Sequence, residues 1–198
     1  MRIRKVKKEI RILAFDDGPF RKGDGKTVLV GVVFRGGIFM DGLLKREIEV
    51  DGTEAEGTII EAVKGCKFKD LRVIMLDGIT FAGFNTVNIR NVHRETGLPV
   101  IVVLRKKPDF SSFIRSLKVL PNAQARLKAV EDAGKVSWVS LKVGGKEGKM
   151  AFQAAGMSFD DASEILKTSA VHAFVPEPLR AAHLIASGLV LGESVGRA

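Results

Sequence analysis

The stretch Leu71-Arg72-Val73-Ile74-Met75-Leu76-Asp77-Gly78 decides how this chain is interpreted, because a mostly aliphatic run leads directly into an Asp-Gly pair. The stretch Ile10-Arg11-Ile12-Leu13-Ala14-Phe15-Asp16-Asp17-Gly18 has the same form. Short apolar runs bounded by turn residues predict buried strands. Ligands of α/β proteins usually bind at the carboxyl ends of strands, so Asp16 and Asp77 are candidate site residues. Asp-Gly is also a common turn pair, which leaves a purely structural interpretation open.

The carboxylates of the two aspartates would repel each other if their strands are neighbours. Asp16 and Asp77 would then meet at one point, with no cation nearby in the sequence. Such repulsion is relieved by a proton or by a divalent metal ion. We therefore expect the two carboxylates within reach of one metal ion, roughly 4–6 Å apart.

Composition favours one globular domain spanning residues 1–198. The chain is 45% hydrophobic with a mean hydropathy of +0.11, which excludes a disordered chain. We find no repeat, linker or low-complexity segment. The single cysteine, Cys66, fits a reducing compartment. No signal peptide or membrane-spanning run is evident, so we expect a cytoplasmic protein without a membrane partner.

The charge of the chain points to nucleic acid. Thirty-two lysines and arginines against 23 acids give a net charge of +9 and a pI near 9.8. Such a surface attracts phosphate backbones, although a generally lysine-rich solvated surface gives the same balance. The basic residues cluster at Arg2–Lys8, Arg105–Lys107 and Arg115–Lys118. Tyrosine is absent and Trp138 is the single tryptophan, so a base-stacking surface would depend on phenylalanines.

The order of expected elements indicates the fold class. Three strands joined by hairpins are followed by alternating helices and strands, which is the order of a ribonuclease H-like α/β domain. We expect a mixed five-stranded sheet with the first strand parallel to the fourth, plus an extra C-terminal hairpin and helices. The expected strands are 10–15, 27–34, 38–50, 71–76, 100–105, 136–143, 149–154 and 171–175. The expected helices are 53–63, 85–95, 110–119, 123–133, 159–168 and 178–186.

Other motifs were tested and set aside. The segment Gly23-Asp24-Gly25-Lys26-Thr27 approximates a phosphate-binding loop, but Phe20 stands where that motif needs glycine and a strand follows instead of a helix. His93 and His172 are interpreted as structural, and the three histidines lack the spacing of a zinc site. Cys66 has no histidine or asparagine partner nearby and is not expected to be a nucleophile.

At this point the residues resemble a known family. Leu13–Phe20, Val73–Asn85 and Leu98–Asp109 resemble an uncharacterised archaeal family that is similar to endonuclease V. The segments Pro176–Arg180 and Gly192–Arg197 also fit that archaeal family, so the resemblance covers nearly the whole chain. The link to endonuclease V itself depends on about three motifs.

The resemblance implies a ribonuclease H-like nuclease that holds Mg²⁺, or Mn²⁺, with carboxylates. Asp16 and Asp77 match two of its metal ligands. The third falls on Glu54 or Glu56, of which we choose Glu54, although a structural role at a helix start explains an acid there equally well.

Basic residues, and polar residues near the C-terminus, complete the expected site. The lysine of that family aligns with Arg105, with Lys106 next to it, and either of the two would hold the scissile phosphate. The histidine or acid near the C-terminus of that family falls near His183 or Glu177. Lys106, Lys107 and Arg115 are expected to bind nucleic acid.

Two departures put recognition of inosine in doubt. Endonuclease V separates bases with a tyrosine-containing wedge, and this chain has no tyrosine. Its Asp-Gly-His-Gly motif is Asp77-Gly78-Ile79-Thr80 here. The expected function is a metal-dependent endonuclease acting on DNA or RNA, with the repair of damaged or unusual structures as one expected setting. The alternatives are a nucleic-acid-binding protein with a decayed site and an enzyme acting on a phosphorylated metabolite.

Overall fold

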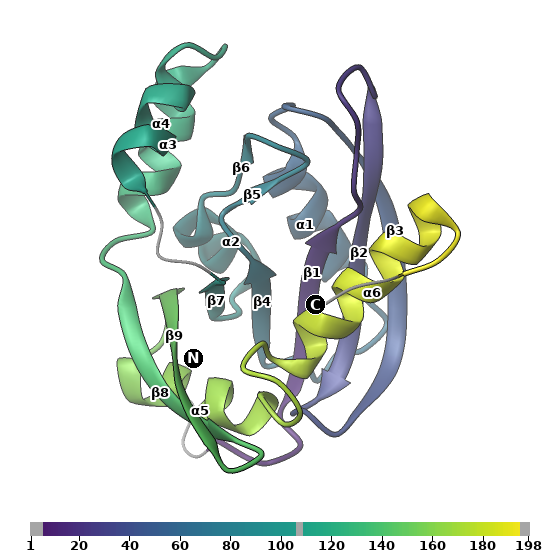
Figure 1. Cartoon of the computed structure of the whole chain (residues 1–198), viewed down its shortest axis with the longest axis vertical. Coiled ribbons are helices and arrows are strands. Elements are labelled where there is room, and N and C mark those ends of the chain that lie inside the picture. Colours follow the sequence, from purple (N-terminus) through teal and green to yellow (C-terminus); the bar gives the residue numbers. More distant parts are fainter. Residues whose placement is uncertain (1–5, 106–108, 195–198) are drawn as a thin grey trace.

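A mixed sheet organises the part of the chain that the computed structural model describes, residues 6–105 and 109–194. In these residues the main sheet has seven strands in the order β3-β2-β1-β4-β7-β9-β8 (Figure 1). The main strands are β1 (Arg11–Asp17), β2 (Lys26–Arg35), β3 (Phe39–Glu49), β4 (Val73–Asp77), β7 (Val100–Leu104), β8 (Ser137–Val143) and β9 (Lys146–Ala155). A small hairpin is formed by β5 (Thr80–Phe81) and β6 (Asn85–Thr86). The helices are α1 (Ala55–Lys64), α2 (Ile89–Thr96), α3 (Phe110–Lys118), α4 (Ala123–Asp132), α5 (Phe159–Ser169) and α6 (Glu177–Leu191).

The central strand pairing agrees with the expectation from the sequence. β1 pairs antiparallel with β2 and parallel with β4, with Phe15 opposite Leu76. β4 in turn pairs parallel with β7. The ribonuclease H-like arrangement is confirmed, and the ends of β1 and β4 lie side by side.

Alternation along the strands separates two cores. On one face, residues such as Ile12, Ala14 and Met75 pack with helices α5 and α6. On the other face, Leu13 and Phe15 pack with α1, α2 and the β5–β6 segment. Figure 1 shows α6 crossing in front of β1 and β2, with α1 and α2 behind the sheet. Because successive strand residues point to opposite faces, the face of each strand-end residue follows from its position.

Several expectations need correction. The sheet has seven strands instead of five, because the C-terminal hairpin does not stand apart: β9 pairs antiparallel with β7 and extends the sheet. The predicted strand at residues 171–175 is wrong, since this segment is a series of bends before α6. The helix predicted from Asn85 begins only at Ile89, because Asn85 and Thr86 form β6. The β5–β6 hairpin was not foreseen because its strands have two residues each.

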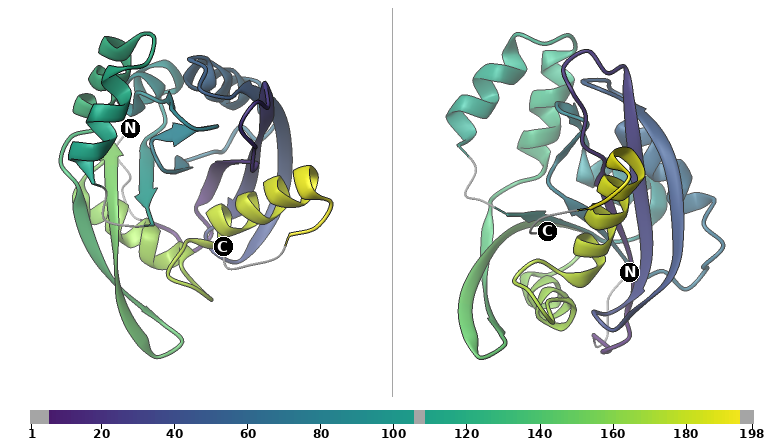
Figure 2. Two further views of the ribbon diagram at one scale, coloured as in Figure 1. Left: turned by 45° about the horizontal axis from the view of Figure 1, so that its top comes forward. Right: turned by 45° about the vertical axis from the view of Figure 1, so that its right-hand side comes forward.

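Helices α3 and α4 extend beyond the sheet. They lie between β7 and β8 in the chain and pack against each other, and α4 also contacts β6 and α2. Figure 2 shows the pair reaching past the ends of β8 and β9. In the described part of the chain, no helix has the length and apolar character needed to cross a membrane. The expected cellular location stays a prediction.

Candidate functional site

Three charged side chains reach the same face at the carboxyl edge of the sheet. Asp16 continues the alternation of Ile12 and Ala14 in β1, so it points toward α6. Asp77 continues the same alternation in β4, and Arg105 follows the last residue of β7 by one. Neighbouring parallel strands therefore place two carboxylates and one guanidinium together, as the sequence indicated.

The guanidinium of Arg105 bridges the two aspartates. Its Nε donates to Asp77 Oδ1 at 3.0 Å and to Oδ2 at 2.8 Å, and its Nη2 also donates to Asp77 Oδ2. The same Nη2 lies 3.8 Å from Asp16 Oδ2. The side chains of Asp16 and Asp77 are 8% and 9% exposed, whereas that of Arg105 is 28% exposed. One cation therefore occupies the position between two nearly buried carboxylates.

A third carboxylate, Asp17, adds to the negative charge. Asp17 points to the opposite face, where its Oδ2 accepts a hydrogen bond from Ala82 N at 2.9 Å. Burial, followed by the charge of Asp16, raises the pKa of Asp17 to about 7, although the bond from Ala82 lowers it. The sequence alone did not single out Asp17 within the Asp-Asp-Gly motif. The adjacent pair of acids after a buried strand was the available signal.

Charge repulsion and burial also act on Asp77. Burial and the charge of Asp16 raise the pKa of Asp77 to about 6, even though the hydrogen bonds and charge of Arg105 oppose the shift. The positive charge of Arg105 thus does not fully compensate the negative charges of the carboxylates. Such an excess of negative charge at a strand edge favours binding of a cation.

Helix α6 supplies His183 to this cluster. The buried residues Leu179, Ala182 and Ala186 form the inner stripe of α6, and His183 lies on that stripe. Its Nδ1 lies 2.8 Å from Asp16 Oδ2, and this hydrogen bond raises the pKa of His183. The side chain is 36% exposed, so it remains accessible.

Different structural constraints explain the glycine that follows Asp16-Asp17 and the glycine that follows Asp77. Gly78 adopts a φ of +87°, a conformation that favours glycine. At Gly18 a Cβ would lie 2.7 Å from methyl groups of both Val28 and Val190, so the chain passes close to β2 and α6. Gly78 therefore lies in a bend after β4, whereas Gly18 is explained by close packing and not by a turn.

The predicted third ligand, Glu54, has a different role. Its carboxylate accepts hydrogen bonds from Glu49 N, from Thr53 N at 2.9 Å and from Asn85 Nδ2 at 3.3 Å. These bonds organise the turn between β3 and α1. Over residues 6–105 and 109–194, no group of three or more His, Cys, Asp or Glu side chains is placed to hold a metal ion. The structure therefore does not assemble the expected set of Asp16, Glu54 and Asp77.

The alternative glutamates are also engaged in local structure. Glu56 accepts from Asn88 N at 2.8 Å and from Asn91 Nδ2, which links α1 to α2. Glu177 is buried at the start of α6 and accepts from His172 N at 2.9 Å and from Arg180 Nε at 3.0 Å. Neither has a hydrogen bond to the aspartate pair among the described contacts.

The remaining predicted residues are scattered. Arg115 is exposed in the last turn of α3, while Lys106 and Lys107 lie outside the described residues. His93 lies in α2, where Nδ1 is 2.9 Å from Leu98 O, in keeping with a structural role. His172 lies in the bends before α6 and not in a strand, because Glu177 fixes that loop.

The arrangement matches a family of nucleases. The model of the family described as endonuclease dU matches residues 8–190. The chain belongs to the endonuclease dU family. A UPF0215 protein of Pyrococcus horikoshii is 46% identical over 196 residues, covering 97% of this chain and 98% of the relative. A UPF0215 protein of Methanothermobacter thermautotrophicus is 48% identical, covering 98% and 95%. The coarse assignment as a nuclease and the archaeal family expected from the motifs both agree with this membership.

Solved structures support the same fold for this endonuclease dU family member. A protein of unknown function from Archaeoglobus fulgidus has a TM-score of 0.80 and 38% identity, covering 91% of this chain and 98% of that one. Endonuclease V of Ciona intestinalis, in complex with DNA containing inosine, has a TM-score of 0.59 and 15% identity, covering 87% and 82%. Endonuclease V of Streptomyces avermitilis has a TM-score of 0.58 and 15% identity, covering 92% and 82%. At these low identities the likeness shows the fold alone.

Proposed function

We propose that the protein is a metal-dependent endonuclease that cleaves DNA containing deoxyuridine. The observation that carries this proposal is the aspartate pair at the ends of β1 and β4, where burial and mutual repulsion raise the pKa of Asp77. The family description supports both nuclease activity and deoxyuridine as the first base to test. The net charge of +9 supports a nucleic acid partner.

The donor atoms suit a hard divalent cation. Asp16 and Asp77 present carboxylate oxygens, which Mg²⁺ and Mn²⁺ prefer, and these two residues would hold the ion. A bound ion would neutralise developing charge on a phosphate and make a bound water more acidic. Because Arg105 lies between the same carboxylates, we expect metal binding to compete with its contact to Asp77.

The chain's own residues have separable tasks. Arg105 is a permanent cation, so it would bind the scissile phosphate and stabilise its charge, but it could not donate a proton. His183 has a raised pKa because it bonds Asp16, and its protonated ring could donate a proton to the leaving oxygen. Asp16 would also fix the ring orientation of His183.

A second candidate is a nucleic-acid-binding protein without catalysis. It is favoured by the arginine that already bridges the aspartates and by the engagement of Glu54 in a turn. Both observations leave fewer carboxylate oxygens available than a site with three acidic ligands would have.

The deciding experiment is a cleavage assay with a panel of nucleic acids. DNA and RNA containing deoxyuridine, inosine, mismatches, flaps and junctions are incubated with Mg²⁺ or Mn²⁺, with EDTA as the control. We expect metal-dependent nicking of deoxyuridine DNA without strong preference for inosine. If nothing is cut with either metal, yet nucleic acid binds at low salt, the non-catalytic candidate replaces the proposal.

A further inference from the structure

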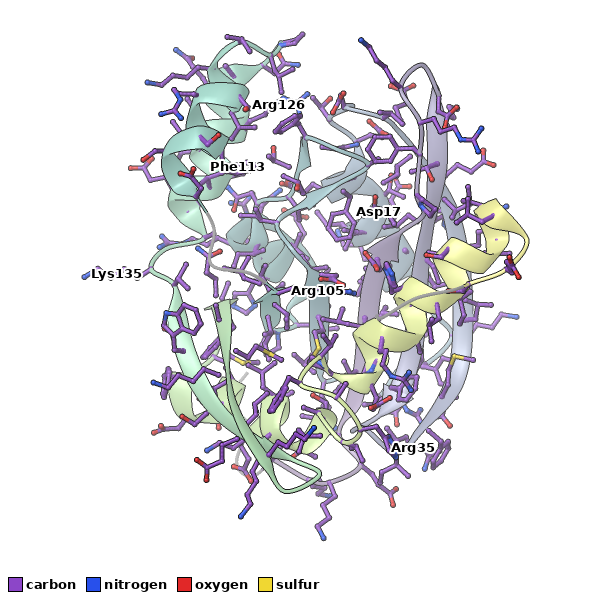
Figure 3. The ribbon with its side chains drawn as sticks, in the orientation of Figure 1. Asp17, Arg35, Arg105, Phe113, Arg126 and Lys135 are labelled. Atoms are coloured by element: carbon purple, nitrogen blue, oxygen red, sulfur yellow. The ribbon has the colours of Figure 1, made fainter. Side chains whose placement is uncertain are left out.

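Two phenylalanine rings meet where the segments that follow β4 and β7 come together. Phe84 and Phe113 have ring centroids 6.2 Å apart and planes inclined by 24°. Phe84 lies at the tip of the β5–β6 hairpin, which follows Asp77, and Phe113 lies in α3, which follows Arg105 in the chain. Because β4 and β7 are neighbouring parallel strands, the segments that follow them bring the two rings together. Figure 3 shows Phe113 on α3 at the carboxyl end of the sheet.

This pair is not part of the protein's interior. Both rings are half-buried, and neither belongs to the two core clusters of the described residues. A third ring, Phe20, is 38% exposed in the loop after β1. A Cβ at Gly83 would lie 3.5 Å from Phe20 Cζ, so this ring contacts the same hairpin tip. Three aromatic rings therefore lie close to the hairpin tip, and packing of the two cores does not explain their presence there.

The hairpin tip is joined to Asp17, the neighbour of Asp16, on the opposite face of β1 from the aspartate pair. Ala82 N donates to Asp17 Oδ2 at 2.9 Å, and Asp17 is adjacent to Asp16 in β1. On its other side, Phe84 N donates to Asp51 Oδ1 at 2.9 Å. The rings are thus carried on a segment whose backbone is hydrogen-bonded to the acidic cluster.

A buried arginine braces this segment. Arg126 of α4 is 2% exposed, and its guanidinium donates to backbone carbonyls of Phe84, of Asp51 at 2.7 Å and of Pro121 at 3.0 Å. Buried charges are costly unless their hydrogen bonds are satisfied, so these contacts fix the guanidinium. Arg126 therefore holds α4, and with it the α3–α4 pair, against the hairpin tip, as Figure 3 also indicates.

We propose that Phe84 and Phe113 form a stacking site for a nucleobase of the nucleic acid substrate. The inference rests on the proposed function for its ligand and assigns the base-contacting surface of the same site. Aromatic faces bind bases of any sequence by stacking, and a basic protein recruits the phosphates around them. Phe20 would extend this stacking surface along the strand of bound nucleic acid. The absence of tyrosine from the chain leaves this task to phenylalanine.

The test measures binding without cleavage. Short single-stranded DNAs carrying one deoxyuridine and a fluorescent end label are titrated with protein in EDTA at low salt, and the dissociation constant is read from anisotropy. The variants are Phe84→Leu and Phe113→Leu, which keep apolar volume but remove the aromatic face. Phe39→Leu is the matched control, because Phe39 is 47% exposed at the start of β3, at the opposite end of the sheet. Thermal unfolding confirms that each variant is folded.

An abasic scan then locates the stacked base. We expect Phe84→Leu and Phe113→Leu to weaken binding roughly 5- to 100-fold. The same loss should vanish when an abasic nucleotide stands at one particular position of the DNA, because no base remains to stack. A Phe84→Trp variant should retain the affinity of the unaltered protein.

Two results would overturn the inference. One is a loss of affinity no greater than that of Phe39→Leu, and the other is a loss that persists at every abasic position. Cleavage is scored separately on the unaltered protein. Base-dependent binding without cleavage would therefore refute the proposed function alone, whereas cleavage with unaffected phenylalanine variants would refute the stacking site alone.

Discussion

The two ends of strand β1 carry clusters of arginine and acidic side chains that differ in how many arginines contact each little-exposed carboxylate. At the start of the strand, Arg11 and Arg35 both bind Asp41, each through one nitrogen at 2.8 Å from Oδ2, and they also pair with the exposed Asp70 and Glu9. At the other end, one arginine, Arg105, faces both Asp16 and Asp77. Figure 3 shows Arg35 and Arg105 at the two separated positions.

The difference appears in the pKa values. The hydrogen bond from Arg35 lowers the pKa of Asp41, whereas burial and the charge of Asp16 raise the pKa of Asp77 to about 6. The first cluster is a satisfied ion pair network that stabilises the fold. The second keeps an excess of acid, which costs stability and favours a positively charged ligand.

The largest expected effect comes from removing that acid. Asp16→Asn or Asp77→Asn should reduce metal-dependent cleavage by about 10³-fold or more, because each would remove a metal ligand. The fold should stay intact, as measured by thermal unfolding. Asp41→Asn is the matched control from the other end of β1, and it should leave cleavage nearly unchanged. Full cleavage by Asp77→Asn would show that the two ends do not differ in function.

Removal of the Arg105 guanidinium should lower cleavage less than removal of either aspartate. Arg105→Ala should lower kcat/KM by about 10²-fold and also weaken DNA binding, since the guanidinium would contact the phosphate in the ground and transition states. Arg35→Ala, measured beside it, should affect stability and not cleavage. Equal losses of cleavage in both variants would contradict the assignment of Arg105.

The pH dependence of stability distinguishes the two ends without any substrate. The pKa of Asp17 is raised from 3.8 to about 7, so the folded protein retains a proton that the unfolded chain loses near pH 4. Stability therefore falls as the pH rises from 4 to 7, and the full cost is present above pH 7. Asp17→Asn cannot ionise, and it should raise the free energy of unfolding at pH 8 by on the order of 2–4 kcal/mol.

The measurement is denaturant unfolding in EDTA at pH 4 and pH 8. The gain from Asp17→Asn should shrink toward pH 4, where the carboxyl of Asp17 is neutral in the folded protein. Asp41→Asn should instead destabilise the protein at pH 8, because the pKa of Asp41 is lowered by its arginine partners. An Asp17→Asn variant that is no more stable than the unaltered protein at pH 8 would show that its charge is compensated.

The smallest expected effect concerns a histidine outside both clusters. His93→Ala removes the contact between Nδ1 and Leu98 O, which should cost about 1 kcal/mol of stability. Cleavage should change by no more than about twofold, because no contact among the described residues joins His93 to the aspartates. His183→Ala, assayed in parallel, should lower cleavage by at least tenfold if its ring transfers a proton.

The sequence predicted the parts of the site that depend on strand pattern. Asp16, Asp77 and Arg105 each follow a buried run, and strand alternation determines the face that each one reaches. It did not predict Asp17, whose carboxylate is held by a backbone group of a hairpin too short to show periodicity. The contacts of Glu54 were not predicted, because a glutamate beside a helix start can turn back onto neighbouring amides, and sequence spacing does not reveal this.

The contact between His183 and Asp16 joins residues that are 167 positions apart. During synthesis, the strand that carries Asp16 is available almost from the beginning, but its partner is added after all the strands of the sheet. The two aspartates can therefore come together while the chain is still growing, whereas His183 joins them only after α6 has docked. Docking of α6 is thus the last step that brings these side chains together, and a nascent protein that lacks α6 would hold the acids without their histidine.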